Sequence, residues 1–174
     1  MTKPEIIAFL RANAPLFGGF ADARLAELVD GSRVAALGAH EAIAHQGSEA
    51  THFGVVLSGS VAASVTGDGG VRQSLGRLEA GGTFGEMALM TGDAMQADFI
   101  TDSPCAVLLI PVSLFQSIIV GEPGAVRSIS RTIADRMKTI LADPASAIDA
   151  WRVVSRRPRK RRSRPRWDLL GNGS

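Results

Sequence analysis

Short apolar runs separated by glycines constrain the fold of this chain more than any other feature. From Ser32 onward, brief valine-rich stretches alternate with turn residues. Short strands bounded by turn residues in this way are typical of antiparallel sheets. The glycines that separate the first of these apolar runs are Gly38, Gly47, Gly54 and Gly59. The pattern therefore predicts a mainly β fold, a β-roll or jelly-roll barrel.

Residues 66–70, Thr-Gly-Asp-Gly-Gly, predict a tight hairpin within this β region. An Asp-Gly pair supplies the positive φ angles that such a turn needs. Two further strands are expected over residues 98–100 and 106–110, joined by a turn at residues 102–104. The predicted antiparallel body therefore ends near residue 110.

Helical periodicity flanks the predicted strands on both sides. Apolar residues recur at helical spacing over residues 3–14 and 21–29, which predicts two opening helices. Residues 112–120 predict a further helix, and the sequence Gly-Glu-Pro-Gly at residues 121–124 breaks it. The β body is therefore expected to carry helices at both ends.

A last amphipathic helix is expected over residues 125–141, ended by Asp143 and Pro144. An apolar stripe on a helix packs by default against the rest of the domain or against a second copy. The stripe consists of Val126, Ile129, Ile133, Met137 and Ile140.

Residues 81–89, Gly-Gly-Thr-Phe-Gly-Glu-Met-Ala-Leu, place a glycine-rich turn before a short apolar helix. Glycine lets the backbone approach a ligand closely, and free N–H groups at a helix start can hold phosphate oxygens. Glu86 is an acceptor that can take a hydrogen bond from a ribose hydroxyl. The pattern predicts a sugar-phosphate pocket. Spacing alone supports the alternative equally well, namely a structural turn that joins a strand to the core.

Residues 84–90 resemble the phosphate-binding cassette of the cyclic nucleotide-binding domain family, and the similarity extends upstream. Residues 41–47 resemble that family's strand-and-turn segment, and residues 53–61 resemble its next hairpin. The similarity covers residues 3–144 and implies a double-stranded β-helix with N-terminal helices and a C-terminal lid helix that often forms a dimer seam. The ligand-binding residues that it implies are Phe84, Gly85, Glu86, Met87, Ala88, Met95, Gln96 and Ala97.

One departure from the family pattern weakens the expected ligand site. High-affinity family members carry Pro-Arg after the cassette, whereas this chain has Ala94 and Met95. Arginine suits the cyclic phosphate because its fixed fork pairs two oxygens at once. Losing one partner of a buried charge pair costs about 2–5 kcal/mol, and ~1.4 kcal/mol is tenfold in affinity. Arg72 or Arg77 is an alternative source of this charge, although a solvated strand position is the more expected role for each.

Charge divides the chain into two parts. Residues 1–150 carry 10 Lys and Arg against 16 Asp and Glu, whereas residues 151–174 carry 9 against 1. We expect a domain over residues 1–144 and a basic, disordered tail over residues 145–174, because charge repulsion and low apolar content disfavour a packed core. Such a tail can contact nucleic-acid phosphates or an anionic membrane surface. A solvated tail with no partner is the alternative.

The remaining chemistry-bearing residues indicate neither a metal site nor an enzyme. His40, His45 and His52 lack metal-ligand spacing, and Cys105 is expected to be a buried structural thiol. No nucleophile stands beside a suitable base. The chain has no long apolar run and no signal-peptide pattern, so we expect a cytoplasmic protein without a membrane span. It is expected to need no cofactor.

The sequence therefore predicts a regulatory sensor module. We expect it to bind a cyclic nucleotide, cAMP or cGMP, weakly and to signal through its C-terminal helix to a partner or to a second copy in a homodimer. The alternative is a ligand-free barrel of the same fold that acts as a protein interaction scaffold. Met95 favours this alternative, and the intact Glu86 favours the sensor.

Overall fold

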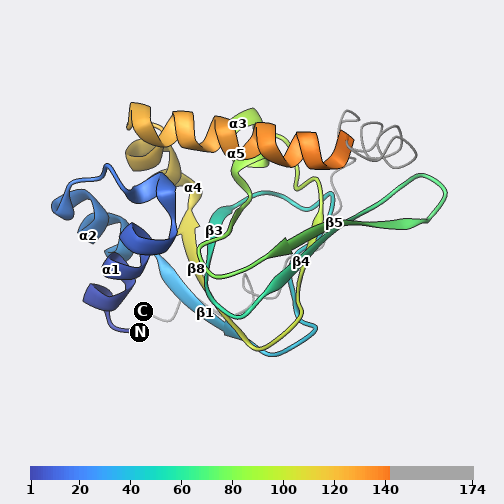
Figure 1. The fold of residues 1–174 in the computed structure, drawn as a ribbon, viewed down its shortest axis with the longest axis horizontal. Coiled ribbons are helices and arrows are strands. Elements are labelled where there is room, and N and C mark those ends of the chain that lie inside the picture. The colour runs from blue at the N-terminus through green and yellow to red at the C-terminus, as the bar shows by residue number, and fades with distance from the viewer. Residues whose placement is uncertain (142–174) are drawn as a thin grey trace.

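The computed structural model describes residues 1–141, which form two four-stranded sheets with helices at one end and a long helix across the top (Figure 1). The first sheet has the order β1-β8-β3-β6 and the second β2-β7-β4-β5, and every pairing is antiparallel. The mainly β prediction is confirmed, with two sheets in place of a closed barrel. The strands are β1 (Arg33–Leu37), β2 (Ala42–Ala44), β3 (His52–Ser58), β4 (Val61–Thr66), β5 (Arg72–Leu78), β6 (Thr83–Phe84), β7 (Asp98–Thr101) and β8 (Cys105–Pro111).

The predicted helices are present on both sides of the sheets. The last helix begins at Pro123, two residues ahead of the expected start, because proline fits the first turn of a helix, where its missing N–H is not needed. Its predicted end at Asp143 and Pro144 lies outside the described residues. The helices are α1 (Lys3–Asn13), η1 (Pro15–Phe17), α2 (Asp22–Asp30), α3 (Glu86–Thr91), α4 (Val112–Leu114), the π-helical turn η2 (Phe115–Ile119) and α5 (Pro123–Leu141).

Strand β3 is buried on both faces, and its side chains divide the interior into two clusters. Phe53, Val55 and Leu57 point toward the N-terminal helices, whereas Val56 lies between the sheets. This division follows from the period of two along a strand. We call the two clusters the helix-side core and the inter-sheet core.

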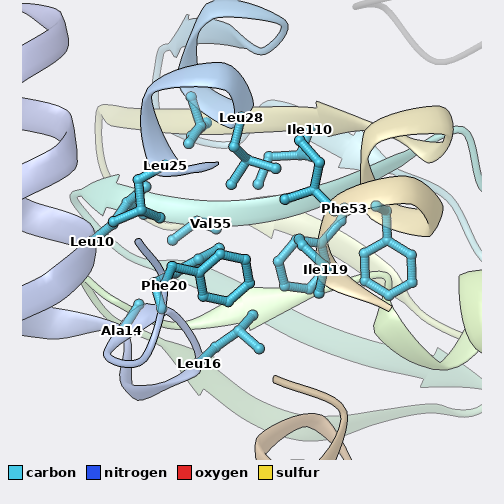
Figure 2. Packing of buried hydrophobic residues seen from close by; sticks show 14 of the residues in the cluster. Leu10, Ala14, Leu16, Phe20, Leu25, Leu28, Phe53, Val55, Ile110 and Ile119 are labelled. Carbon is cyan, nitrogen blue, oxygen red and sulfur yellow. The ribbon is translucent and has the colours of Figure 1, made fainter. Parts of the chain in front are cut away.

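The helix-side core joins α1, α2 and the π-helical turn to the outer face of the first sheet (Figure 2). It includes Leu10, Phe17, Leu25, Leu28, Phe53, Val55, Ile110, Phe115 and Ile119. The inter-sheet core fills the space between the two sheets. It includes Ile43, Val56, Val61, Phe84, Ala88, Met95, Ala97, Phe99, Val107 and Leu109.

The predicted hairpin joins β4 to β5, but its positive φ angle lies elsewhere than expected. Gly70 has a φ of 76°, whereas Asp68 and Gly69 keep negative φ angles. The N–H of Gly70 donates to the carbonyl of Gly67 at 2.9 Å, and the N–H of Gly67 donates to the carbonyl of Val71 at 3.0 Å. A glycine in the left-handed region after a turn is a common way to close a longer hairpin loop.

Candidate functional site

The glycine-rich segment between β5 and α3 turns as tightly as its sequence predicts. Gly81 and Gly85 have φ angles of 89° and 88°, which other residues rarely adopt. A Cβ atom on Gly85 would lie 2.9 Å from the carbonyl oxygen of His52, and one on Gly81 would overlap the backbone of Asn13. These two positions therefore require glycine. Gly85 sets the start of α3 close against strand β3, and Gly81 sets the turn close against the end of α1.

A cavity of about 170 Å³ opens beside this segment. Its walls come from β4, β5, the start of α3, the loop before β7 and the second half of α5. The structure brings seven of the eight expected ligand-binding residues into its lining. These are Gly85, Glu86, Met87, Ala88, Met95, Gln96 and Ala97.

Phe84, the eighth expected residue, lies in the inter-sheet core and not in the cavity lining. Its ring stacks on Phe99 with a centroid distance of 4.9 Å. It also covers Gly54, where any side chain would overlap the ring. Phe84 therefore fixes the strand that leads into the site.

Glu86 is the one carboxylate among the described residues that line the cavity, and only 2% of its surface is exposed. Its Oε1 accepts a hydrogen bond from Nη1 of Arg136 on α5, while its Oε2 has no hydrogen-bond partner among the described residues. Burial raises the pKa of Glu86, and the positive charge of Arg136 opposes this effect. The site thus contains a buried acceptor oxygen that no described residue satisfies.

The other arginines near the cavity are already paired with carboxylates. Arg77 lines the cavity, but its Nε lies 2.7 Å from Oδ2 of Asp102. Arg72 does not line it, and its Nη2 lies 3.6 Å from Oδ2 of Asp98. Both side chains are more than half exposed, as expected for solvated strand residues.

Met95 occupies the position where the family pattern has arginine, and it is buried in the inter-sheet core. Its N–H donates to the carbonyl of Ser48 at 2.8 Å, and its own carbonyl accepts from Gly47 at 2.7 Å. The backbone of this position is therefore held in place, and its side chain adds an apolar surface to the cavity.

Sequence reasoning missed Arg136, which lines the cavity and pairs with Glu86 across 50 positions of the chain. A signal was present in the last helix. Arg136 follows Ile133 by three positions and Ile129 by seven, so it lies along the edge of the apolar stripe. A charged residue on the packed edge of a helix needs a partner, and the buried Glu86 provides one.

Cys105 is buried, as predicted, and its Sγ donates to the carbonyl of Ser60 at 3.2 Å. Burial raises the pKa of this thiol.

Among residues 1–141, no group of three or more His, Cys, Asp or Glu side chains lies close enough together to hold a metal ion. No helix in that range is both long and apolar enough to cross a membrane. The predicted tail, residues 145–174, lies outside the described part of the chain.

Comparison with known proteins gave a match to one family model, curated relatives over part of the chain, and solved structures. The family model of the cyclic nucleotide-binding domain matches residues 35–121. The curated relative lysophospholipase nte1 of Aspergillus terreus is 29% identical over 106 residues, which cover 61% of this chain but 7% of that protein. The activity of so much longer a relative does not extend to this chain by similarity alone.

Two solved structures have the same fold. One is a mutant regulatory subunit of a cAMP-independent protein kinase A from Trypanosoma brucei, bound to cAMP, with a TM-score of 0.68 and 20% identity. The alignment covers 75% of this chain and 46% of that one. The other is the catabolite activator protein of Thermus thermophilus, with a TM-score of 0.64, 23% identity, and coverage of 72% and 59%.

Proposed function

We propose a sensor role from the premise that this chain belongs to the cyclic nucleotide-binding domain family. In this proposal the chain binds cAMP or cGMP weakly in the cavity beside α3 and transmits ligand occupancy through α5. It is a regulatory binding module and not an enzyme. Its ligand contacts are the seven expected residues in the cavity lining.

The observation that carries the proposal is the buried carboxylate of Glu86. A buried oxygen without a hydrogen-bond partner is costly unless something satisfies it. Oε2 of Glu86 is such an oxygen among the described residues, and Glu86 lines the cavity. A ribose hydroxyl is a donor that would satisfy it, so the donor set of the cavity fits the sugar of a nucleotide.

Weak binding follows because no residue among positions 1–141 offers a free positive charge to a phosphate in the cavity. Met95 offers no charge, and Arg72 and Arg77 are paired with Asp98 and Asp102. The loss of about 2–5 kcal/mol expected for the missing arginine would move a micromolar site toward the millimolar range. We therefore expect dissociation constants well above those of family members that keep the arginine.

The route to a signal is α5, because this helix contributes to both the cavity and the helix-side core. Arg136 and Met137 line the cavity, whereas Ala125 and Ile129 are buried against the N-terminal helices. If α5 can adopt two positions, a ligand that binds more tightly to the protein in one of them shifts the population toward that position. The signal would then pass to a partner or to a second copy.

Hydrogen exchange and NMR titration of the full chain would test both parts of this proposal. Addition of cAMP is expected to shift the backbone resonances of residues 85–88 and 95–97 with one saturation curve. It is also expected to change the exchange protection of α5. Shifts without a change in α5 would contradict the signalling role, and no saturable shifts at all would contradict nucleotide binding.

The competing proposal is a ligand-free interaction scaffold of the same fold. The apolar Met95 and the carboxylate partners of the nearby arginines favour it, because both reduce affinity for an anion. The two proposals differ in what happens at Glu86. A scaffold gains or keeps its partner binding when Glu86 is replaced by alanine, whereas a sensor loses its response to nucleotide.

A separate proposal concerns the basic segment. In it, residues 1–144 form the domain, and the tail over residues 145–174 contacts nucleic-acid phosphates or an anionic membrane surface. Clustered arginines bind phosphate backbones through counterion release, so this contact would be strongest at low salt. Deletion of residues 152–167 is expected to abolish retention on DNA at low salt. Retention that survives the deletion would end this proposal.

A further inference from the structure

Charge is distributed unevenly between α5 and the rest of the described structure. Residues 1–122 carry 6 Lys and Arg against 13 Asp and Glu, whereas α5, over residues 123–141, carries 4 against 1. The helix lies on the outside of the molecule, along the top of the two sheets (Figure 1). Positive charge is therefore concentrated on one outer helix of an otherwise acidic domain.

The outer side of α5 is basic along most of its length. Exposed residues recur at positions 127, 131, 134 and 138, at intervals of three or four, so they lie on one side of the helix. Three of them are cations. We call these four residues, Arg127, Arg131, Ala134 and Lys138, the basic face.

Arg127 and Arg131 have no partner in the described part of the chain. Within residues 1–141 their guanidinium groups make no hydrogen bond or ion pair, whereas each of the other eight Lys and Arg residues interacts with another group. Lys138 has a carboxylate nearby, with its Nζ 3.6 Å from Oδ1 of Asp135. The two arginines are therefore available to an external anion such as phosphate.

The length and position of the basic face suit an extended polyanion. Arg127 and Lys138 are eleven positions apart, so the face spans about 16 Å of helix axis. A nucleic acid presents a row of phosphates over such a length. The basic segment at residues 151–174 begins ten positions after the last residue of α5. A polyanion that contacts this segment is thus held near the basic face.

The exposed side chains favour a nucleic acid over a membrane surface. A helix that lies on a bilayer buries its apolar face among the lipids. In α5 the apolar side chains face inward, with Ala125 and Ile129 buried in the helix-side core. No large apolar side chain is exposed between residues 123 and 138. The outer side of the helix therefore offers charge without an apolar surface to insert.

We propose that the basic face of α5 binds the phosphate backbone of a nucleic acid beside the contact made by the basic tail. The inference rests on the proposed tail contact, because three cations alone hold a polyanion weakly. It extends that proposal to a defined surface of the folded domain. Contacts to phosphate carry no sequence information, so binding is independent of base sequence. Arg127, Arg131 and Lys138 all lie outside the cavity lining.

Binding of the full chain to a short DNA duplex, measured at several salt concentrations, tests this contact. Each phosphate contact changes the slope of log affinity against log salt by about 0.9. The double variant Arg127→Gln, Arg131→Gln should bind several-fold more weakly at low salt, with a slope shallower by about 2. Ala134→Lys adds a cation to the face and should bind more tightly, with a slope steeper by about 1.

The matched control is the double variant Lys3→Gln, Arg24→Gln. It removes the same charge from exposed side chains of α1 and α2, where Lys3 and Arg24 are paired with Asp30 and Glu27. Because these side chains lie outside the basic face, the control should keep the slope of the wild type. Equal losses in the control and in the α5 variant would assign the effect to net charge and overturn the inference.

Two further proteins separate this inference from the proposed tail contact. An α5 double variant with the affinity and slope of the wild type would overturn the inference and leave the tail contact standing. A chain without residues 152–167 that still binds DNA through Arg127 and Arg131 would contradict the tail contact alone. A full chain that binds phosphatidylserine vesicles but not DNA would overturn the inference, and so would a full chain that binds neither.

Discussion

The two cores of this molecule are made from the same kinds of residue but serve different purposes. The helix-side core is filled by large apolar side chains, many of them fully buried (Figure 2). The inter-sheet core borders a cavity of about 170 Å³ and the buried carboxylate of Glu86. Close packing stabilises a fold, whereas a cavity and a buried charge both cost stability. The comparison indicates that the helix-side core contributes more to the stability of the fold, whereas the inter-sheet core is less stable because it borders the candidate site.

The largest effect is expected in the helix-side core. Phe53 is fully buried and packs on Phe115 with a centroid distance of 5.2 Å, so Phe53→Ala should lower the free energy of unfolding by about 3–5 kcal/mol. Met95→Ala should lower it by about 2 kcal/mol, because Met95 already borders a cavity. Urea unfolding measures the free energy of unfolding of both variants. Equal decreases in the two variants would contradict the proposed difference between the cores.

Glycine replacements sharpen the comparison at the cassette. Gly85 and Gly92 flank α3 and both have positive φ angles, of 88° and 75°. Gly92→Ala should cost about 1–2 kcal/mol from backbone strain alone, because nothing lies near its Cβ position. Gly85→Ala should cost more and should also weaken nucleotide binding, since its Cβ meets the carbonyl of His52. Urea unfolding and cAMP titration of both variants measure these effects. A larger loss of stability or of cAMP affinity in Gly92→Ala than in Gly85→Ala would contradict the prediction.

Restoring the family arginine tests why the site is expected to bind weakly. Met95→Arg places a guanidinium in the cavity lining and should tighten cAMP binding by about tenfold or more, at some cost in stability. Met90→Arg is the control, because Met90 is exposed on α3, five positions before Met95, and its replacement adds an equal charge outside the cavity. Equal gains in the two variants would show that the gain is a general effect of charge.

The smallest expected effect is a change in the pH dependence of stability. Burial raises the pKa of Glu86, so the folded state binds a proton more tightly than the unfolded state, whose reference pKa is 4.5. The wild type should therefore lose stability relative to Glu86→Gln as the pH rises from 4.5 through the raised pKa of Glu86.

The slope of this difference is at most about 1.4 kcal/mol per pH unit, the value for one proton. The ion pair with Arg136 exists only when Glu86 is ionised, so its effect on stability is already contained in the pKa of Glu86. Urea unfolding between pH 4 and 8 measures the slope. A wild type that gains stability relative to the variant over this range would contradict the sign.

Local sequence signals predicted most of the fold, and the resemblance to the family added the residues after α3 that line the cavity. The strands, the hairpin at residues 66–70 and the turn at Gly85 all depend on neighbouring residues, which a sequence displays directly. The pairing of Arg136 with Glu86 was not predictable in this way, because it joins positions 50 residues apart. Phe84 illustrates the same limit, since only the packing of Gly54 and Phe99 shows that its ring belongs to the core.

The central claim is that the cavity around Glu86 binds a cyclic nucleotide, and calorimetry tests it most directly. The full chain and its Glu86→Ala variant are titrated with cAMP and with cGMP up to millimolar concentration. The account predicts a weak, saturable heat for the wild type with at least one nucleotide and its loss in the variant. A wild type that gives no heat, or a variant that binds as well as the wild type, would contradict it.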